Sequence, residues 1–392
     1  MRLYTCFWIG LLVILLPPGV SANKLFDKSA RKQMTVWLND DCQWLVSSDT
    51  GKEVTSPGTV PVDPMVTEAT IARALVVGFE LTKDNPQFLQ DSLRRCETLL
   101  SLQKTVKTSR GNGGGCWLGT ADRQGDLDLG VNGIIAGALT RVSADADNAL
   151  RNRILGAVEK YALMILEGCA QDPLNKGRES TAGWIVQDGE QKGALGAGYL
   201  KDHVSRKPST MATAANAAFF AQLFSVTHKT QYQSLAREAV RWLIAKQSAV
   251  GFFPTLLDGI DSGEASMDTL TAGTEAVLSV DYLCAESSLK QQIHSDIEPV
   301  ARWLLRTQDE KGLWGSKQDQ RGSTGAVTLL AWFYLAGTKD EAFPQALDKA
   351  WQILTNPVHA QSFGVQISAY TTALMALTTA EMIKPGISFK KS

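Results

Sequence analysis

The sequence predicts an all-α protein, an (α/α)6 toroid in which six helical hairpins build an inner and an outer ring of helices. Three observations predict this fold class. Apolar residues recur at helical spacing through most of the 392 residues, and no convincing period of two indicates a strand. Charged and apolar helices alternate strictly along the chain. The helix pairs return at intervals of about 55 residues, which is typical of a repeat architecture.

The predicted outer helices carry charge on one face, as a helix with a solvated stripe does. They span residues 29–47, 88–104, 146–168, 230–247, 288–308 and 341–356. The predicted inner helices are rich in Ala, Gly, Thr and aliphatic residues, and a helix that is apolar nearly all round is buried. They span residues 66–82, 127–142, 210–227, 267–284, 321–337 and 364–383. The last inner helix is as apolar as the central ones, which favours a closed ring over an open solenoid with polar caps.

Residues 1–22 have the layout of a secretory signal peptide. Arg2 precedes the apolar run 6–16, Pro17 and Pro18 break this run, and residues 20–22 (Val-Ser-Ala) offer a small-residue cleavage site. An uncleaved membrane anchor is the alternative. We expect residues 23–392 to form a single toroid domain that is secreted or periplasmic. No later stretch reaches ~18 uninterrupted apolar residues, so we expect no membrane association after cleavage.

Charge and cysteine content indicate which ligands and which disulfides to expect. With 39 Lys and Arg against 40 Asp and Glu, the net charge of −1 argues against nucleic acid. No cluster has metal-ligand spacing, and we expect a monomer without metal or cofactor. Cys116 and Cys169 each follow an outer helix, which suggests a disulfide between two long loops; Cys42 with Cys96 is a second possible pair.

A local motif marks the helical repeat. Residues 303–314 read W-L-x3-Q-x3-G-x-W, and residues 242–253 have the same spacing with Phe at the end. We expect the Trp-Leu pair to pack inward, the Gln to satisfy backbone groups at the helix end, and the Gly to permit the turn. The pattern resembles the QW repeat of triterpene cyclases and the Gly-aromatic turns of protein prenyltransferase β subunits. Both are α/α toroids, so the resemblance implies a fold and not a chemistry.

Loop length predicts which face carries the site. Loops from an outer to the next inner helix are long, at 48–65, 105–126, 169–209, 248–266 and 309–320, although the last one, 357–363, is shorter. The reverse connections are short. All connections of one type emerge on one face of a toroid, and long loops are usually functional. The face with the amino ends of the inner helices is therefore the expected site, and its free N–H groups favour an anionic ligand group.

Carboxylates on this face suggest a glycoside hydrolase. Such an enzyme needs two facing carboxylates, one protonated and one ionised. Asp126 or Asp128 with Asp268 is the preferred pair, because inner helices bracket the cavity. The competing explanation is that Asp126 and Asp268 are helix N-caps.

The longest loop suggests a polysaccharide lyase instead. A lyase needs a base and groups that hold a uronate carboxylate. Tyr199, His203 and Arg206 lie within eight residues, and Asn132 or Asn216 could hydrogen-bond the carboxylate. Candidate substrate-binding residues on the loops are Trp117, Trp184, Trp314 and Arg321. The aromatic ones could equally be core plugs beneath long loops.

The leading hypothesis is a secreted carbohydrate-active enzyme, a lyase or a glycoside hydrolase, that cleaves an acidic polysaccharide in the toroid cavity. One alternative is a non-catalytic secreted toroid that binds a small molecule. Another is an enzyme similar to terpene cyclases or prenyltransferases. This last one lacks support, because the zinc ligands of the transferases are missing and residues 126–129 (Asp-Leu-Asp-Leu) lack the third carboxylate of the cyclase acid.

Overall fold

The computed structural model describes residues 27–47, 62–83, 85–119, 126–201, 203–249, 251–315, 322–338, 340–354 and 368–389; the expected signal peptide lies outside them. The outer helices are α1 (Lys28–Ser47), α3 (Pro86–Leu102), α5 (Asn148–Glu167), α7 (Thr230–Ala245), α9 (Ser287–Thr307) and α11 (Ala342–Leu354). The inner helices are α2 (Pro64–Thr82), α4 (Leu129–Ser143), α6 (Thr210–Thr227), α8 (Met267–Leu283), α10 (Gly322–Leu335) and α13 (Ala369–Ile383). Outer and inner helices thus alternate as predicted.

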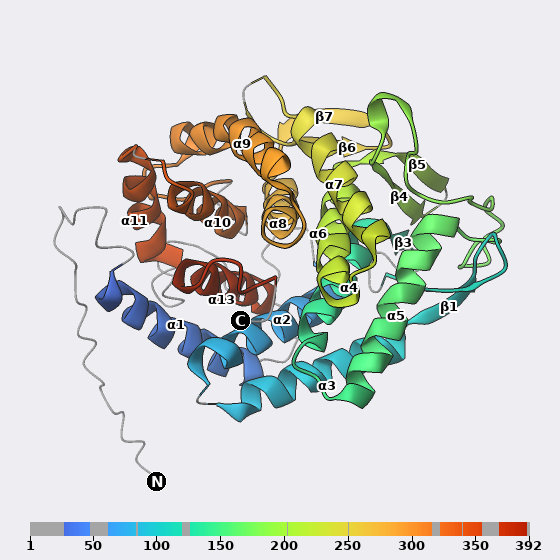
Figure 1. The fold of residues 1–392 in the computed structure, drawn as a ribbon, viewed down its shortest axis with the longest axis horizontal. Coiled ribbons are helices and arrows are strands. Elements are labelled where there is room, and N and C mark those ends of the chain that lie inside the picture. Colours follow the sequence, from blue (N-terminus) through green and yellow to red (C-terminus); the bar gives the residue numbers. More distant parts are fainter. Residues whose placement is uncertain are drawn as a thin grey trace, which may run out of the picture.

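The inner helices close a ring. Each packs against the next from α2 through α4, α6, α8 and α10 to α13, and α13 packs back against α2 (Figure 1). This arrangement confirms the (α/α)6 toroid and excludes the open solenoid. None of the described helices combines the length and the apolarity that a bilayer span requires.

Small residues let the inner helices approach closely. A Cβ atom added to Gly133 of α4 would lie 2.9 Å from the Cβ of Ala215 on α6. A Cβ added to Gly325 of α10 would lie 2.6 Å from Oγ1 of Thr271 on α8. The Ala, Gly and Thr content of the inner helices is therefore a packing requirement of the ring.

The glutamine of the repeat joins neighbouring outer helices. Gln308 donates from Nε2 to the Ala346 carbonyl of α11 at 2.8 Å, and also to the Gly312 carbonyl of its own turn at 2.9 Å. Gln247 donates to the Asp296 carbonyl of α9 in the same way. The predicted role in satisfying backbone groups is confirmed, and the structure adds that each bond ties one hairpin to the next.

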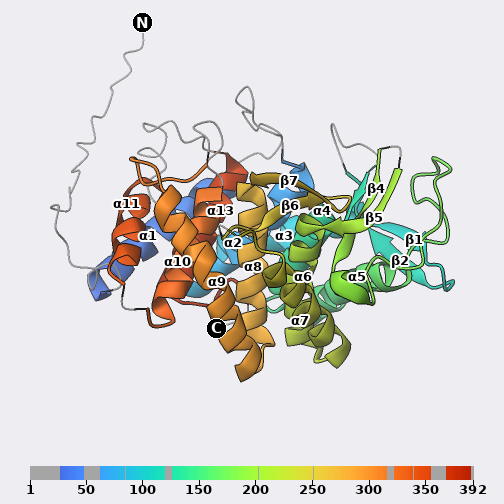
Figure 2. The ribbon, with the colours of Figure 1, turned by 90° about the horizontal axis from the view of Figure 1, so that it is seen from above.

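Short antiparallel strands occupy the connections at the amino ends of the inner helices, contrary to the expectation of no strands (Figure 2). β1 (Lys104–Lys107) pairs with β2 (Gly113–Cys116), and β6 (Pro254–Leu257) pairs with β7 (Ile260–Ala265). β3 (Leu127–Asp128) pairs with β4 (Leu195–Leu200), which pairs with β5 (His203–Ser209). Buried and exposed residues do not alternate along these strands, as β4 and β5 show, so the sequence carried no period of two.

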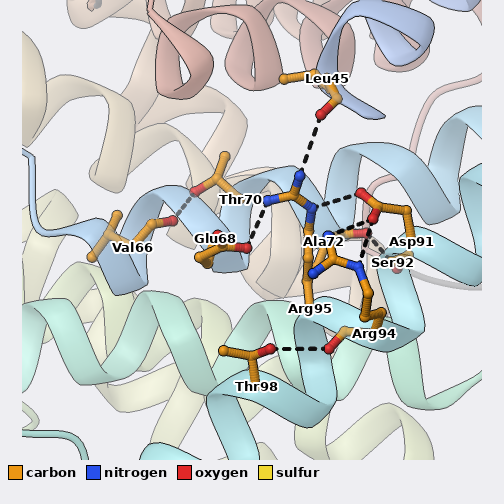
Figure 3. A network of polar contacts seen from close by, with 10 residues as sticks. All are labelled: Leu45, Val66, Glu68, Thr70, Ala72, Asp91, Ser92, Arg94, Arg95 and Thr98. Atoms are coloured by element: carbon orange, nitrogen blue, oxygen red, sulfur yellow. Dashed lines mark hydrogen bonds and ion pairs between the residues drawn. The ribbon is translucent and has the colours of Figure 1, made fainter. Parts of the chain in front are cut away.

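Arg95 fastens the first three helices together (Figure 3). From α3, its guanidinium donates to Glu68 of α2 and to Asp91 one turn earlier, both at 2.7 Å, and to the Leu45 carbonyl of α1 at 3.3 Å. Arg95 itself is buried, whereas its carboxylate partners Glu68 and Asp91 are partly exposed. The network sets the outer helices α1 and α3 against the start of α2, which contributes to the site.

The five described cysteines are all buried and free, so the expected disulfides are not present. Cys42 packs against the backbone of α2, with its Sγ 3.9 Å from the Ala74 carbonyl. Burial raises the pKa of both the Cys116 and the Cys169 thiol to about 12. The thiols are therefore held in the protonated form, which is a poor nucleophile for disulfide exchange.

Candidate active site

A cavity of about 550 Å³ lies at the amino ends of the inner helices. Residues of α2, α4, α6, α8 and α13 form its wall, and residues of the β4–β5 and β6–β7 hairpins also line it. Both hairpins lie on the face with the long connections (Figure 2). This volume is within the range of small-molecule sites. The cavity thus lies on the face that the loop lengths indicate.

Carboxylates from three inner helices converge on this cavity. The described lining contains five of them, and the basic side chains beside them are Arg73 and Lys201. The carboxylates are Asp63, Asp126, Asp128, Asp268 and Glu275. The three sequence candidates Asp126, Asp128 and Asp268 are therefore brought together.

Asp128, and not Asp126, is the N-cap of α4. Its Oδ1 accepts hydrogen bonds from the backbone N–H groups of Gly130 at 2.8 Å and Val131 at 3.1 Å. Asp126 instead accepts from the Lys201 N–H at 2.6 Å, which joins it to the turn of the β4–β5 hairpin. Capping therefore explains the position of Asp128 and leaves that of Asp126 to the hairpin.

Asp268 is not a cap either. Ser266 caps α8 by accepting from the Thr269 N–H at 3.3 Å, and Asp268 lies exposed in the first turn of the helix. The N-cap alternative is thus wrong for Asp126 and Asp268. Its proposed partners, Asp126 and Asp128, lie at the start of α4, and α6 packs between α4 and α8.

Asp63 also lines the cavity, although the sequence had assigned it no catalytic or binding role. It caps α2, with its Oδ1 accepting from the Met65 N–H at 2.8 Å, and its side chain lines the cavity. The signal was present in the sequence, because Asp followed by Pro64 is a favoured combination at the start of a helix.

An ion pair lies deeper in the cavity. Nη1 of Arg73 on α2 is 2.7 Å from Oε1 of Glu275 on α8, and only 5% of Arg73 is exposed. Arg73 was missed by sequence reasoning. Its signal is that it is the single charged residue in the stretch 69–79 of α2, because buried Arg is rare unless it is paired.

The turn of the β4–β5 hairpin carries the basic part of the lining. Lys201 has a positive φ of 29°, a strained conformation for a residue with a Cβ. Its N–H is held by Asp126, and its carbonyl accepts from Lys176 at 3.2 Å and from Arg178 at 3.3 Å. These hydrogen bonds to the N–H and to the carbonyl of Lys201 hold the strained turn beside the cavity.

His203 borders the cavity beside this turn. Its Nε2 lies 3.0 Å from Oδ2 of Asp258, at the turn between β6 and β7. Burial acts to raise the pKa of Asp258, but hydrogen bonds from Ser205 and His203 outweigh it and leave that pKa below its ordinary value. The pair therefore links the two hairpins at the rim.

The other two residues of the expected lyase set are not in the cavity. Tyr199 is fully buried, its hydroxyl donates to the Glu179 carbonyl at 2.9 Å, and burial raises its pKa to about 12. Arg206 lies with its Nε 3.4 Å from a Glu179 carboxylate oxygen and donates to the Ser180 carbonyl. Both residues thus support the loop that precedes β4.

The predicted aromatic binding residues are core residues. Trp117 and Trp314 donate from Nε1 to the carbonyls of Leu99 and Leu304, each at 2.8 Å. Trp184 is 2% exposed and packs edge-on against Tyr199. None of the three tryptophans is among the described lining of the cavity, which agrees with the reading of these side chains as core plugs. Arg321 lies outside the described residues.

The two asparagines also have structural roles. The Asn132 side chain accepts from the Trp117 N–H at 2.7 Å and donates to the Trp117 carbonyl at 2.8 Å. Asn216 accepts from the Tyr161 hydroxyl at 2.9 Å and donates to the Leu129 and Ala212 carbonyls. Both side chains are fully buried, so neither can reach a ligand in the cavity.

Solved structures with the same fold cover nearly the whole chain. A polysaccharide lyase aligns with 91% of this chain and 98% of its own, at 11% identity and a TM-score of 0.59. A glycosyl hydrolase of family 88 from Bacteroides vulgatus covers 93% and 99%, at 9% identity and a TM-score of 0.60. The GH76A α-1,6-mannanase from Salegentibacter sp. HEL1_6 covers 90% and 100%, at 10% identity and a TM-score of 0.55.

At these identities the similarity shows the fold alone. It confirms the toroid class with relatives named as carbohydrate-active enzymes, whereas the relation to terpene cyclases stays a resemblance of the repeat. No protein-family model matches the sequence, and no curated protein matches it. No three His, Cys, Asp or Glu side chains of the described residues form a group that could hold a metal ion.

Proposed function

We propose that the protein is a carbohydrate-active enzyme that cleaves an acidic polysaccharide in the toroid cavity, and that it acts as a glycoside hydrolase. The observation that carries this proposal is the convergence of carboxylates from α2, α4 and α8 on one cavity. Hydrolysis of a glycosidic bond needs such a pair, one to protonate the leaving oxygen and one to act as base or nucleophile. The names of the structural neighbours agree with this class.

Asp128 and Asp268 suit the two roles. Two N–H donors at the start of α4 fix the Asp128 carboxylate in place, which suits a positioned base or nucleophile. Asp268 on α8 supplies the second carboxylate of the pair. Asp126 positions the β4–β5 turn at the edge of the same site.

An acidic substrate is supported by the charge of β5 and its turn. Lys201 and His203 line the cavity, and Lys207 is exposed farther along the strand. Cations at the rim would hold the acidic groups of a glycan outside the carboxylate-rich interior. The lyase reaction is less well supported, because of its expected residues only His203 borders the cavity.

The test compares Asp128→Asn and Asp268→Asn with Asp188→Asn, a control at an exposed Asp that makes no capping bond. Asn caps helices as well as Asp, so Asp128→Asn removes the charge and keeps the cap. We expect release of reducing ends from a panel of acidic glycans to fall by about 10²- to 10⁴-fold for the two site variants only.

Three other outcomes have distinct meanings. Release of an unsaturated, ultraviolet-absorbing product would establish a lyase. Glycan binding without turnover, unchanged in Asp268→Asn, would support the non-catalytic binding toroid. Loss of activity in Asp188→Asn to the same degree would show that the assay reports general damage.

The mature protein is proposed to be secreted or periplasmic, as a single toroid domain from residue 23. The support is the layout of residues 1–22. Expression of the full chain in a secretion-competent host, followed by amino-terminal sequencing of the exported protein, tests this. Retention of residues 1–22 in a membrane fraction would favour the anchor instead.

A further inference from the structure

Residues 384–389 close the ring at the end away from Asp128 and Asp268. They follow α13 and turn back into the ring, where Ile387, Ser388 and Phe389 are each at most 3% exposed. Glu381 of α13 accepts from the N–H groups of Gly386 and Ser388, both at 2.7 Å. These bonds hold the segment as a plug between the carboxyl-terminal halves of the inner helices.

Two arginines of the inner ring hold the plug from other sides. Arg141 of α4 donates from Nε to the Ile387 carbonyl at 3.2 Å. Arg73 of α2 donates from Nε to the Ser388 carbonyl at 3.1 Å, and its guanidinium lies 5.1 Å from the centre of the Phe389 ring. The plug is therefore fixed to α2, α4 and α13 by buried polar contacts.

The Arg73–Glu275 pair separates the cavity from this plug. Both residues line the cavity, and both also line a chamber of about 30 Å³ that has Ser388 and Phe389 in its wall. Such a chamber has room for a water molecule or two and not for a sugar. The ion pair is thus the floor on which a ligand in the cavity would rest.

The floor lies well below the carboxylates proposed for the reaction. Arg73 is ten residues after Asp63, the N-cap at the mouth end of α2, which is about 15 Å along a helix. Glu275 is seven residues after Asp268 on α8, which is about 10 Å. A ligand can therefore extend from the floor to the reacting carboxylates, but it cannot continue through the ring.

We propose that the cavity is a blind pocket for the end of a glycan chain, with Glu275 hydrogen-bonding the hydroxyl groups of the terminal sugar. This inference rests on the proposed function and specifies its substrate as chain ends. Arg73 occupies one oxygen of Glu275 at 2.7 Å and orients the carboxylate, so that its other oxygen can accept from a ligand. A bond that lies between the floor and the mouth is then cleaved one or a few sugars from the end.

The first test compares one acidic glycan with free ends and the same glycan with both ends capped. We expect short products from the earliest time points, little loss of viscosity, and no turnover of the capped chain. Titration calorimetry of short oligosaccharides should show at least tenfold weaker binding of the capped form. Random internal cleavage, or equal binding of both forms, overturns the blind pocket and leaves the hydrolase intact. Absence of both binding and turnover across the panel overturns the proposed function, and this inference with it.

The second test compares Glu275→Gln with Glu190→Gln, a control at an exposed Glu outside the cavity. For Glu275→Gln we expect about a tenfold rise in KM, or in Kd by calorimetry, for chains with free ends, with a smaller change in kcat. This corresponds to the loss of one charge-assisted hydrogen bond. An unchanged KM and Kd in a variant with the normal unfolding midpoint would remove Glu275 from the binding site.

Discussion

Replacement of Arg141 tests the internal electrostatics of the ring most directly. The Arg141 side chain is completely buried, and its two terminal nitrogens lie 2.7 Å from Glu80 and 3.2 Å from Asp145. Both carboxylate side chains are at most 6% exposed. In Arg141→Met they would lose their counter-ion, and the Ile387 carbonyl would lose its donor. Removal of one partner from a buried ion pair costs about 3–5 kcal/mol, which we expect as the loss in unfolding free energy.

The loss should grow as the pH rises. Burial raises the pKa of Glu80, against the lowering effect of Arg141, so in Arg141→Met this pKa rises further. A carboxyl group with a raised pKa binds more protons in the folded than in the unfolded state. The stability of Arg141→Met should therefore fall between about pH 5 and pH 8 more steeply than that of the wild type.

Urea unfolding followed by tryptophan fluorescence at these two pH values measures both effects. Arg153→Met is the matched control, because its ion pair with Glu97 at 3.1 Å is more than half exposed on both sides. We expect the control to lose about 0–1 kcal/mol at either pH. The added substitution Glu80→Gln should recover part of the loss in Arg141→Met. Equal losses in Arg141→Met and Arg153→Met, or a loss independent of pH, would refute this reasoning.

Three further predictions concern packing, a polar clamp and a titrating loop. Gly251→Ala should lower the free energy of unfolding in urea by more than about 1 kcal/mol, because its φ is +92° and a Cβ would lie 2.3 Å from a carbonyl oxygen of α9. The control Gly156→Ala, in open space on α5, should be neutral or stabilising. The opposite order would contradict the steric explanation. Asn132→Ala should lower the free energy of unfolding by about 1–3 kcal/mol for each backbone group of Trp117 that it leaves without a partner. An unchanged urea midpoint would show that water replaces the side chain. Hydrogen bonds from Arg178 hold the pKa of Asp172 well below its ordinary value. Arg178→Met should therefore destabilise the protein near pH 7, and less so as the pH falls below about 4. A loss of stability that does not depend on pH would point to packing alone.

The helical framework could be predicted because its signals are local. The sequence indicates an outer helix at 230–247 and an inner one at 210–227, and the structure places them at Thr230–Ala245 and Thr210–Thr227. Outer helices carry a charged face and inner helices are apolar nearly all round, so the composition of each helix predicts which ring it belongs to. The short strands escaped prediction because the hairpins are brief, and because buried and exposed residues do not alternate along them; in β4, for example, five of six residues are buried.

The candidate site was predictable only in part. The residues at the starts of inner helices converge because a ring places all these starts on one face, and this holds for Asp128 and Asp268. The loop residues had no such constraint. The sequence does not distinguish a tryptophan that binds a ligand from one that packs in the core. The structure shows that the indole N–H of Trp314 donates to a helix carbonyl, that of Leu304.

The sequence by itself determined the layers, the alternation and the face on which long connections gather, since these follow from periodicity over neighbouring residues. Only the tertiary structure decided which polar groups share the cavity and which support the wall. It also decided that the ring is closed at one end, because Arg73 meets Ser388 and Arg141 meets Ile387 across hundreds of residues of chain. Contacts of that sequence separation depend on how the whole ring closes, and no local pattern contains them.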